Sequence, residues 1–210
     1  MSKYVSFQGH SIVSCGILRR ELTYLETTSF LDADQVFYTE PGLHANRDEL
    51  KAQLTRQLGN ARTVSQHVIV VFGDNCHLDI DQITRGTHIS RVDVEDCIDV
   101  LADLETRKAM SGGKTGSMFW LTPGWLDHVV ENRYVWERIY KGHLGWDAAD
   151  ANVNFGTYRK AIFLDPQPLN VYDEYTPQNI LDFSGWTRLT VVRHEVTLAR
   201  FKRLLFRCVQ

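Results

Sequence analysis

The stretch HVIVVFGDNCH, residues 67–77, decides the fold class of this chain. Residues 67–72 form a nearly continuous run of β-branched and other apolar side chains, which is typical of a strand covered on both faces. Gly73, Asp74 and Asn75 end the run, because these residue types favour turns. The stretch therefore predicts a central strand of a parallel sheet, with Cys76 and His77 directly after its carboxyl end.

Similar strand-to-helix units precede and follow this stretch. Apolar runs of strand length alternate with segments of helical periodicity along the whole chain. The other predicted strands are 11–15, 35–39, 88–92, 118–122, 160–164 and 189–192. This alternation predicts an α/β fold, a layered and mainly parallel sheet of about seven strands with helices on both faces.

The length of 210 residues fits one large domain. We find neither a Pro-, Gly- or Ser-rich linker nor an internal repeat, so we predict a single α/β domain over residues 1–210. The least regular stretch, residues 142–158, is a candidate for an irregular insertion. Two helices are also predicted, one starting at Asp93 and a long, aromatic-rich one after Pro123 and Gly124.

Charge and hydropathy exclude several kinds of partner. With 23 Lys and Arg against 26 Asp and Glu, the net charge is −3, and no basic cluster offers a footprint for nucleic acid. The longest apolar run is too short to cross a membrane. The first ten residues lack the apolar core of a signal peptide, so we expect a cytoplasmic protein.

Three cysteines follow predicted strands. Cys15 ends the first strand, Cys76 follows the third, and Cys97 lies in the first turns of the helix after the fourth. Because ligands of open α/β sheets bind at the carboxyl ends of the strands, we expect these thiols to converge. His44 and His77 follow the second and third strands, so each could join them.

A group of thiols and an imidazole suits a soft metal. The expected cofactor is zinc, an iron–sulfur cluster or another soft metal. Three cysteines and one histidine make a closed tetrahedral zinc site, whereas three cysteines alone leave one coordination position of the metal open. Two alternatives remain. The cysteines could simply pack as small buried side chains, or one of them could be a reactive thiol activated by a histidine or a helix N-terminus. Cys208 lies away from any strand end and is left out of the site.

Two tryptophans surround the turn after the predicted strand 118–122. Trp120 and Trp125 would wall a cofactor pocket at the carboxyl edge, since aromatic side chains exclude water from such sites. The alternative is that both fill the core. Either way, a metal-free protein that binds a small metabolite or cofactor is the second functional hypothesis.

Short motifs from residue 13 to residue 126 resemble the Domain of Unknown Function 1638 family of archaeal and bacterial proteins. They are Cys15-Gly16-Ile17-Leu18 with Glu21-Leu22, Leu43-His44, Val71-Phe72-Gly73 before Cys76, Asp96-Cys97-Ile98, and Leu121-Thr122-Pro123-Gly124-Trp125-Leu126. The resemblance implies an accessory role in corrinoid-dependent or one-carbon methyl transfer, with corrinoid or methyltransferase proteins as partners. It implies no particular reaction, so whether the protein is an enzyme stays open.

Overall fold

The computed structural model describes residues 6–129, 133–171 and 177–210. Contacts between Cα atoms divide the chain into two compact units. The first consists of residues 1–100 and 199–210, and the second consists of residues 101–198. Each unit contains its own parallel sheet, and the prediction of one domain over the whole chain stays a prediction.

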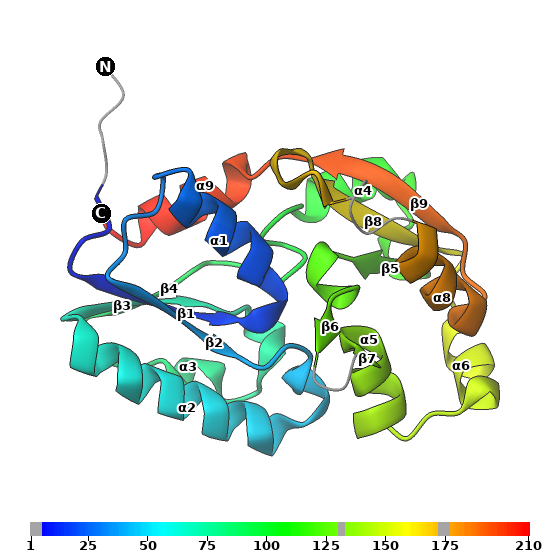
Figure 1. Cartoon of the computed structure of the whole chain (residues 1–210), viewed down its shortest axis with the longest axis horizontal. Helices are drawn as coiled ribbons and strands as arrows, with labels where there is room; N and C mark the ends of the chain where they lie inside the picture. The colour runs from blue at the N-terminus through cyan, green and yellow to red at the C-terminus, as the bar shows by residue number, and fades with distance from the viewer. Residues whose placement is uncertain (1–5, 130–132, 172–176) are drawn as a thin grey trace. The chain divides into compact units, whose positions relative to one another are not determined.

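The first unit contains a four-stranded parallel sheet in the order β2-β1-β3-β4 (Figure 1). Its strands are β1 (His10–Cys15), β2 (Gln35–Thr39), β3 (His67–Val71) and β4 (Ile89–Arg91). Ile12, Ile69 and Val70 are fully buried, as expected for strands covered on both faces. The stretch 67–77 thus supplies an inner strand, as predicted.

Helices cover both faces of this sheet (Figure 1). They are α1 (Arg19–Thr27), α2 (Arg47–Val64), α3 (Ile80–Ile83) and α9 (Ala199–Arg207). Helix α2 begins where the Asn46 side chain accepts a hydrogen bond from the Glu49 backbone N–H. Its Leu50, Leu54 and Leu58 recur every fourth residue and are buried against β1, β2 and β3.

The second unit contains a three-stranded parallel sheet in the order β5-β8-β9 and an antiparallel β6-β7 hairpin. The strands are β5 (Met118–Leu121), β6 (His128–Val129), β7 (Arg133–Tyr134), β8 (Lys160–Pro166) and β9 (Val191–Val196). The helices are α4 (Leu104–Ser111), α5 (Val135–Glu137) with a π-helical continuation (Arg138–His143), α6 (Ala148–Phe155) and α8 (Pro177–Thr187). Aromatic rings fill its core, where Tyr140 and Phe155 make an edge-to-face contact at 5.0 Å between centroids.

The α/β class and the seven parallel strands are confirmed, although they form two sheets of four and three strands. The last predicted strand, 189–192, is wrong in its bounds, since β9 spans 191–196. The long helix after Pro123 and Gly124 is also wrong: a single 3-10 turn (Pro123–Trp125) leads into the β6-β7 hairpin. Residues 142–158 contain the regular helix α6, which Asp147 caps, and their being an insertion stays a prediction.

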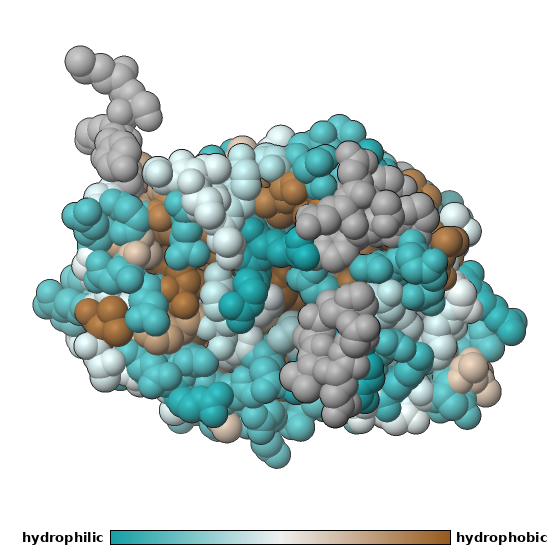
Figure 2. All heavy atoms as spheres, in the orientation of Figure 1, coloured by the Kyte–Doolittle hydropathy of each residue, from teal (hydrophilic) through white to brown (hydrophobic). Residues whose placement is uncertain are grey.

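Hydrophilic and intermediate residues cover most of the face shown in Figure 2, with hydrophobic residues appearing between them. Most of the large apolar side chains lie in the interior. Among the helices of the described residues, none is both long enough and apolar enough to cross a membrane.

Candidate metal centre

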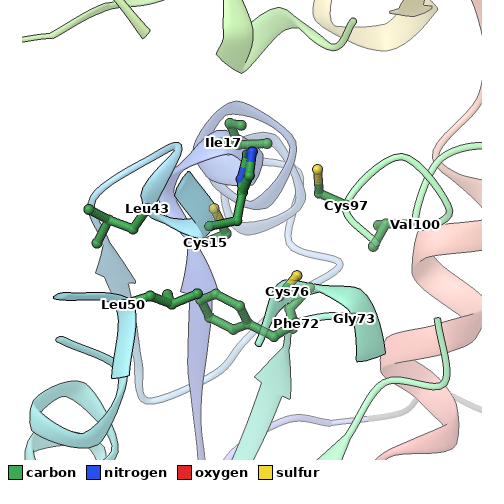
Figure 3. A pocket seen from close by; sticks show the side chains of 11 residues that line it. Cys15, Ile17, Leu43, Leu50, Phe72, Gly73, Cys76, Cys97 and Val100 are labelled. Carbon is green, nitrogen blue, oxygen red and sulfur yellow. The ribbon is translucent and has the colours of Figure 1, made fainter. Parts of the chain in front are cut away.

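A small cavity lies at the carboxyl ends of β1 and β3, and Figure 3 shows the three predicted cysteines around it. Its volume is about 30 Å³. Every lining residue belongs to the first unit. The lining consists of Cys15, Ile17, Leu43, His44, Leu50, Val71, Phe72, Gly73, Cys76, Cys97 and Val100. All three cysteines that the sequence analysis singled out therefore line one cavity.

Cys15 is the last residue of β1. The next residue, Gly16, begins a 3-10 turn packed tightly against β2, where an added Cβ would lie 2.6 Å from the Thr39 carbonyl oxygen. Burial raises the pKa of the Cys15 thiol, although hydrogen bonds from Ile17, Gly42 and Thr39 act in the opposite direction. The sulfur thus lies among donors that stabilise a thiolate once its proton is removed.

Cys76 closes the 3-10 turn Asp74–Cys76 that follows β3. Gly73 precedes this turn and packs against the backbone of the segment that carries Cys97, since an added Cβ would lie 2.4 Å from the Asp96 nitrogen. Burial, and next the proximity of Cys15, raise the pKa of the Cys76 thiol to about 12. Cys76 is therefore a neutral thiol near pH 7.

Cys97 lies on a loop between β4 and α4, so its predicted place on a helix starting at Asp93 is wrong. Side-chain hydrogen bonds explain the difference, because they compete with those of a helix. The Asp96 carboxylate accepts from the Asp99 N–H at 2.8 Å, and the Asp99 carboxylate accepts from the Glu95 N–H at 3.0 Å. Burial raises the pKa of the Cys97 thiol well above its usual value.

The three sulfurs influence one another electrostatically. After burial, the main causes that raise the pKa of Cys97 are its interactions with Cys15 and Cys76. Such interactions weaken with distance, in agreement with the position of all three cysteines in the lining of one cavity. All four cysteines of the chain are free thiols.

The two candidate histidines differ in position. Gly42 adopts a left-handed conformation with φ of 80° and leads into the 3-10 turn Leu43–Ala45, which places His44 in the cavity lining. Burial lowers the pKa of His44, so its imidazole is neutral and able to ligate a metal near pH 7. His77 is absent from the lining, and its buried ring accepts a hydrogen bond from the Asp79 N–H at 2.9 Å.

The thiols stand apart in their present rotamers. Within the described ranges, no three His, Cys, Asp or Glu side chains already surround a common point that could hold a metal ion. Ligation would thus require the cysteines to rotate about their Cα–Cβ bonds, which connect discrete staggered positions. The donor set itself, three thiols and one neutral imidazole, fits a soft metal ion.

Trp120 and Trp125 both belong to the second unit. Trp125 is buried, stacks on Tyr140 at 6.3 Å between ring centroids and contacts Phe119 edge-to-face at 5.8 Å. Trp120 is partly buried on β5. These contacts favour the core-filling alternative for Trp125, whereas the role of both residues as pocket walls stays a prediction.

Sequence reasoning missed two features of the first unit. One is the apolar part of the lining of the thiol cavity, which includes Leu50 and Phe72. The sequence pattern of these two residues indicates only ordinary core positions. The other is a second cavity of about 320 Å³, which is lined by Ser90, Arg91, Asp93, Leu204, Arg207 and Cys208. Its lining comes from β4 and the residues after it and from α9, which are far apart in the sequence. No spacing pattern in the sequence predicts such a contact. Cys208 lies here and not with the other thiols, as expected.

Comparison with known proteins places the chain in a family. No curated protein and no solved structure matches it. A family model matches residues 38–205, a range that contains His44, Cys76 and Cys97 and begins after Cys15. Since this match covers most of the chain and agrees with the motifs noted in the sequence, the protein belongs to the family described as Protein of unknown function (DUF1638).

Proposed function

We propose that the first unit binds one soft metal ion through Cys15, Cys76 and Cys97, with His44 as the fourth ligand. The observation that carries this proposal is the convergence of three thiols from separate segments on one cavity. Buried cysteines are common, but three of them from three separate segments around one space are not required by packing. Thiolate sulfur and imidazole nitrogen are the ligands that zinc prefers.

The size of the cavity favours a single ion over a cluster. Its 30 Å³ exceeds the roughly 10–15 Å³ that one water molecule needs, so it accommodates one or two water-sized groups. An iron–sulfur cluster of several iron and sulfide atoms would need the surrounding side chains to move apart. Of the two metal centres predicted from the sequence, the structure thus supports zinc or another single soft ion better.

The chemistry of the thiols argues against the reactive-cysteine alternative. Catalytic cysteines have a lowered pKa, which keeps them as thiolates. Burial instead raises the pKa of Cys15, Cys76 and Cys97. A metal ion supplies the positive charge that favours loss of their protons. These thiols are therefore better suited to act as metal ligands than as nucleophiles.

The metabolite-binding alternative has less support at this cavity. Pockets for small molecules are typically about 300–1,000 Å³, roughly ten to thirty times the 30 Å³ between the thiols. The accessory role in corrinoid-dependent or one-carbon methyl transfer, with its protein partners, remains a proposal that rests on the family resemblance. The cytoplasmic location also stays a prediction from the sequence.

The proposal is tested by measuring the metal content of the full chain after anaerobic purification, followed by zinc titration of the apoprotein. We expect about one ion per chain, no visible absorbance of an iron–sulfur cluster, and a loss of zinc affinity of at least tenfold in Cys15→Ser, Cys76→Ser and Cys97→Ser.

Cys208→Ser is the matched control, because this cysteine is also free and partly buried but lies at the other cavity. It should bind zinc like the unaltered chain. Equal metal content in all four variants would show that the three thiols are not the ligands.

A further inference from the structure

The side chains that line the thiol cavity carry no full positive charge to balance the negative charge of a thiolate complex. Among the described residues that line it, none is a Lys, Arg, Asp or Glu, and most are apolar. Arg91 is a cation with an electrostatic effect on Cys76. Arg91 already forms ion pairs with Asp74 at 2.5 Å and with Asp81 at 2.6 Å, so these two carboxylates balance its positive charge.

The net charge of the possible complexes then differs with the ion. Three thiolates around a divalent ion leave one negative charge in an apolar cavity, and a monovalent ion leaves two. Burying an uncompensated charge is costly. A trivalent ion with three thiolates gives a neutral complex, which the apolar lining accommodates without that cost.

From these observations we propose that the cavity between Cys15, Cys76 and Cys97 is selective for a trivalent thiophilic metalloid such as arsenic(III). This inference rests on the proposed function, because it uses the same three ligands. Trivalent arsenic forms three bonds to sulfur in a pyramid, with a lone pair in the fourth direction. It therefore needs no ligand from His44, and a cavity of about 30 Å³ leaves room for one such atom.

The binding reaction is balanced without an oxidant or a reductant. Arsenous acid, As(OH)₃, is a neutral molecule in water near pH 7. Each thiol S–H bond and one As–O bond break, an As–S bond forms, and the hydroxyl group leaves with the thiol proton as water. Three such exchanges give As(SR)₃ and three water molecules, and the oxidation state of arsenic stays +3.

The test is a parallel titration of the full-length apoprotein with inorganic arsenite and with zinc, followed by calorimetry and by elemental analysis after desalting. We expect one arsenic per chain and displacement of zinc by arsenite. Cys15→Ser, Cys76→Ser and Cys97→Ser should each weaken arsenite binding at least about tenfold, whereas Cys208→Ser should not.

His44→Ala separates the two ions, since it should weaken zinc binding and leave arsenite binding unchanged. Circular dichroism of each variant verifies that it is folded, and protection of the cysteines from alkylation by arsenite gives a second readout in the unaltered chain. Tight zinc binding without arsenite binding, or arsenite binding that needs His44, would overturn the metalloid inference and leave the metal proposal standing. Failure to bind either ion would overturn both.

Discussion

Arg200 holds the backbone and the side chain of Asp99 at the same time. Its Nε donates to the Asp99 carbonyl oxygen at 2.5 Å, and its terminal nitrogen donates to the Asp99 carboxylate at 2.8 Å. Asp99 lies two residues after Cys97, on the loop that brings this cysteine to the cavity. Helix α9 thereby fixes the position of a candidate ligand that lies about one hundred residues earlier in the chain.

Removing this contact should loosen the Cys97 loop. In Arg200→Ala, the Asp99 carbonyl and carboxylate each lose a charged donor, which costs about 1–3 kcal/mol in the free energy of unfolding. Urea denaturation measures this loss, and zinc titration should show weaker binding. Arg203→Ala is the control, because its exposed side chain on the same helix should change stability by less than about 0.5 kcal/mol. Equal behaviour of the two variants would contradict a role for the Arg200 contact.

Gly73 should tolerate no side chain. A Cβ at this position would lie 2.4 Å from backbone atoms of Glu95 and Asp96, which cannot move without displacing Cys97. Gly73→Ala should therefore lower the free energy of unfolding by about 1–3 kcal/mol and weaken zinc binding.

Gly59→Ala is the matched control for this substitution. Gly59 lies inside α2 with no atom near its added Cβ, so alanine there should raise helix stability by up to about 1 kcal/mol. A Gly73→Ala variant as stable as Gly59→Ala would show that the loop adapts easily.

The cysteines should react slowly with alkylating agents. Burial raises the pKa of Cys15, of Cys76 to about 12, and of Cys97, so the thiolate fraction at pH 8 is smaller than that of a free thiol. Iodoacetamide labelling, followed by mass spectrometry, should be slower for all three than for free cysteine. It should accelerate as the pH rises above 9 and when urea unfolds the chain. A cysteine that reacts faster than free cysteine in the native protein would restore the reactive-thiol hypothesis.

In the second unit, the side chain of Arg193 should contribute more to the free energy of unfolding than that of Glu195, its exposed partner. Its Nε donates to the Asp165 carboxylate at 2.6 Å, and Asp165 is only 1% exposed. Arg193→Ala leaves this buried charge without its main partner, which should cost about 3–5 kcal/mol in the free energy of unfolding. Glu195→Ala removes only a loose surface pair at 3.6 Å and should cost less than about 1 kcal/mol. Thermal denaturation compares the two, and a similar cost for both would show that Arg193 does not neutralise Asp165.

The positions of Cys15 and Cys76 were predictable because the parallel α/β pattern brings the carboxyl ends of neighbouring strands to one edge. Cys15 and Cys76 each end or follow such a strand, and β1 and β3 are adjacent in the sheet. His44 was predictable for the same reason, because β2 pairs with β1 on its other side.

Other features depend on contacts that one sequence does not reveal. The ring of His77 is turned to accept a hydrogen bond from Asp79, a choice that depends on the exact turn after β3. The loop around Cys97 has helical periodicity, but side-chain hydrogen bonds to Asp96 and Asp99 override it. The division into two sheets depends on which strands pair, and strand length and spacing alone do not determine this pairing.

The discontinuity of the first unit affects how this protein can be made. Residues 101–198 leave the ribosome before α9 does, although α9 supplies Phe201 and Leu205 to the interior of the chain and Arg200 to the Cys97 loop. A nascent chain that has emerged as far as residue 198 thus carries all three candidate ligands before the helix that secures the third. During translation, there is therefore an interval in which all three thiols have been synthesised but the Arg200 contact that holds the Cys97 loop has not yet formed.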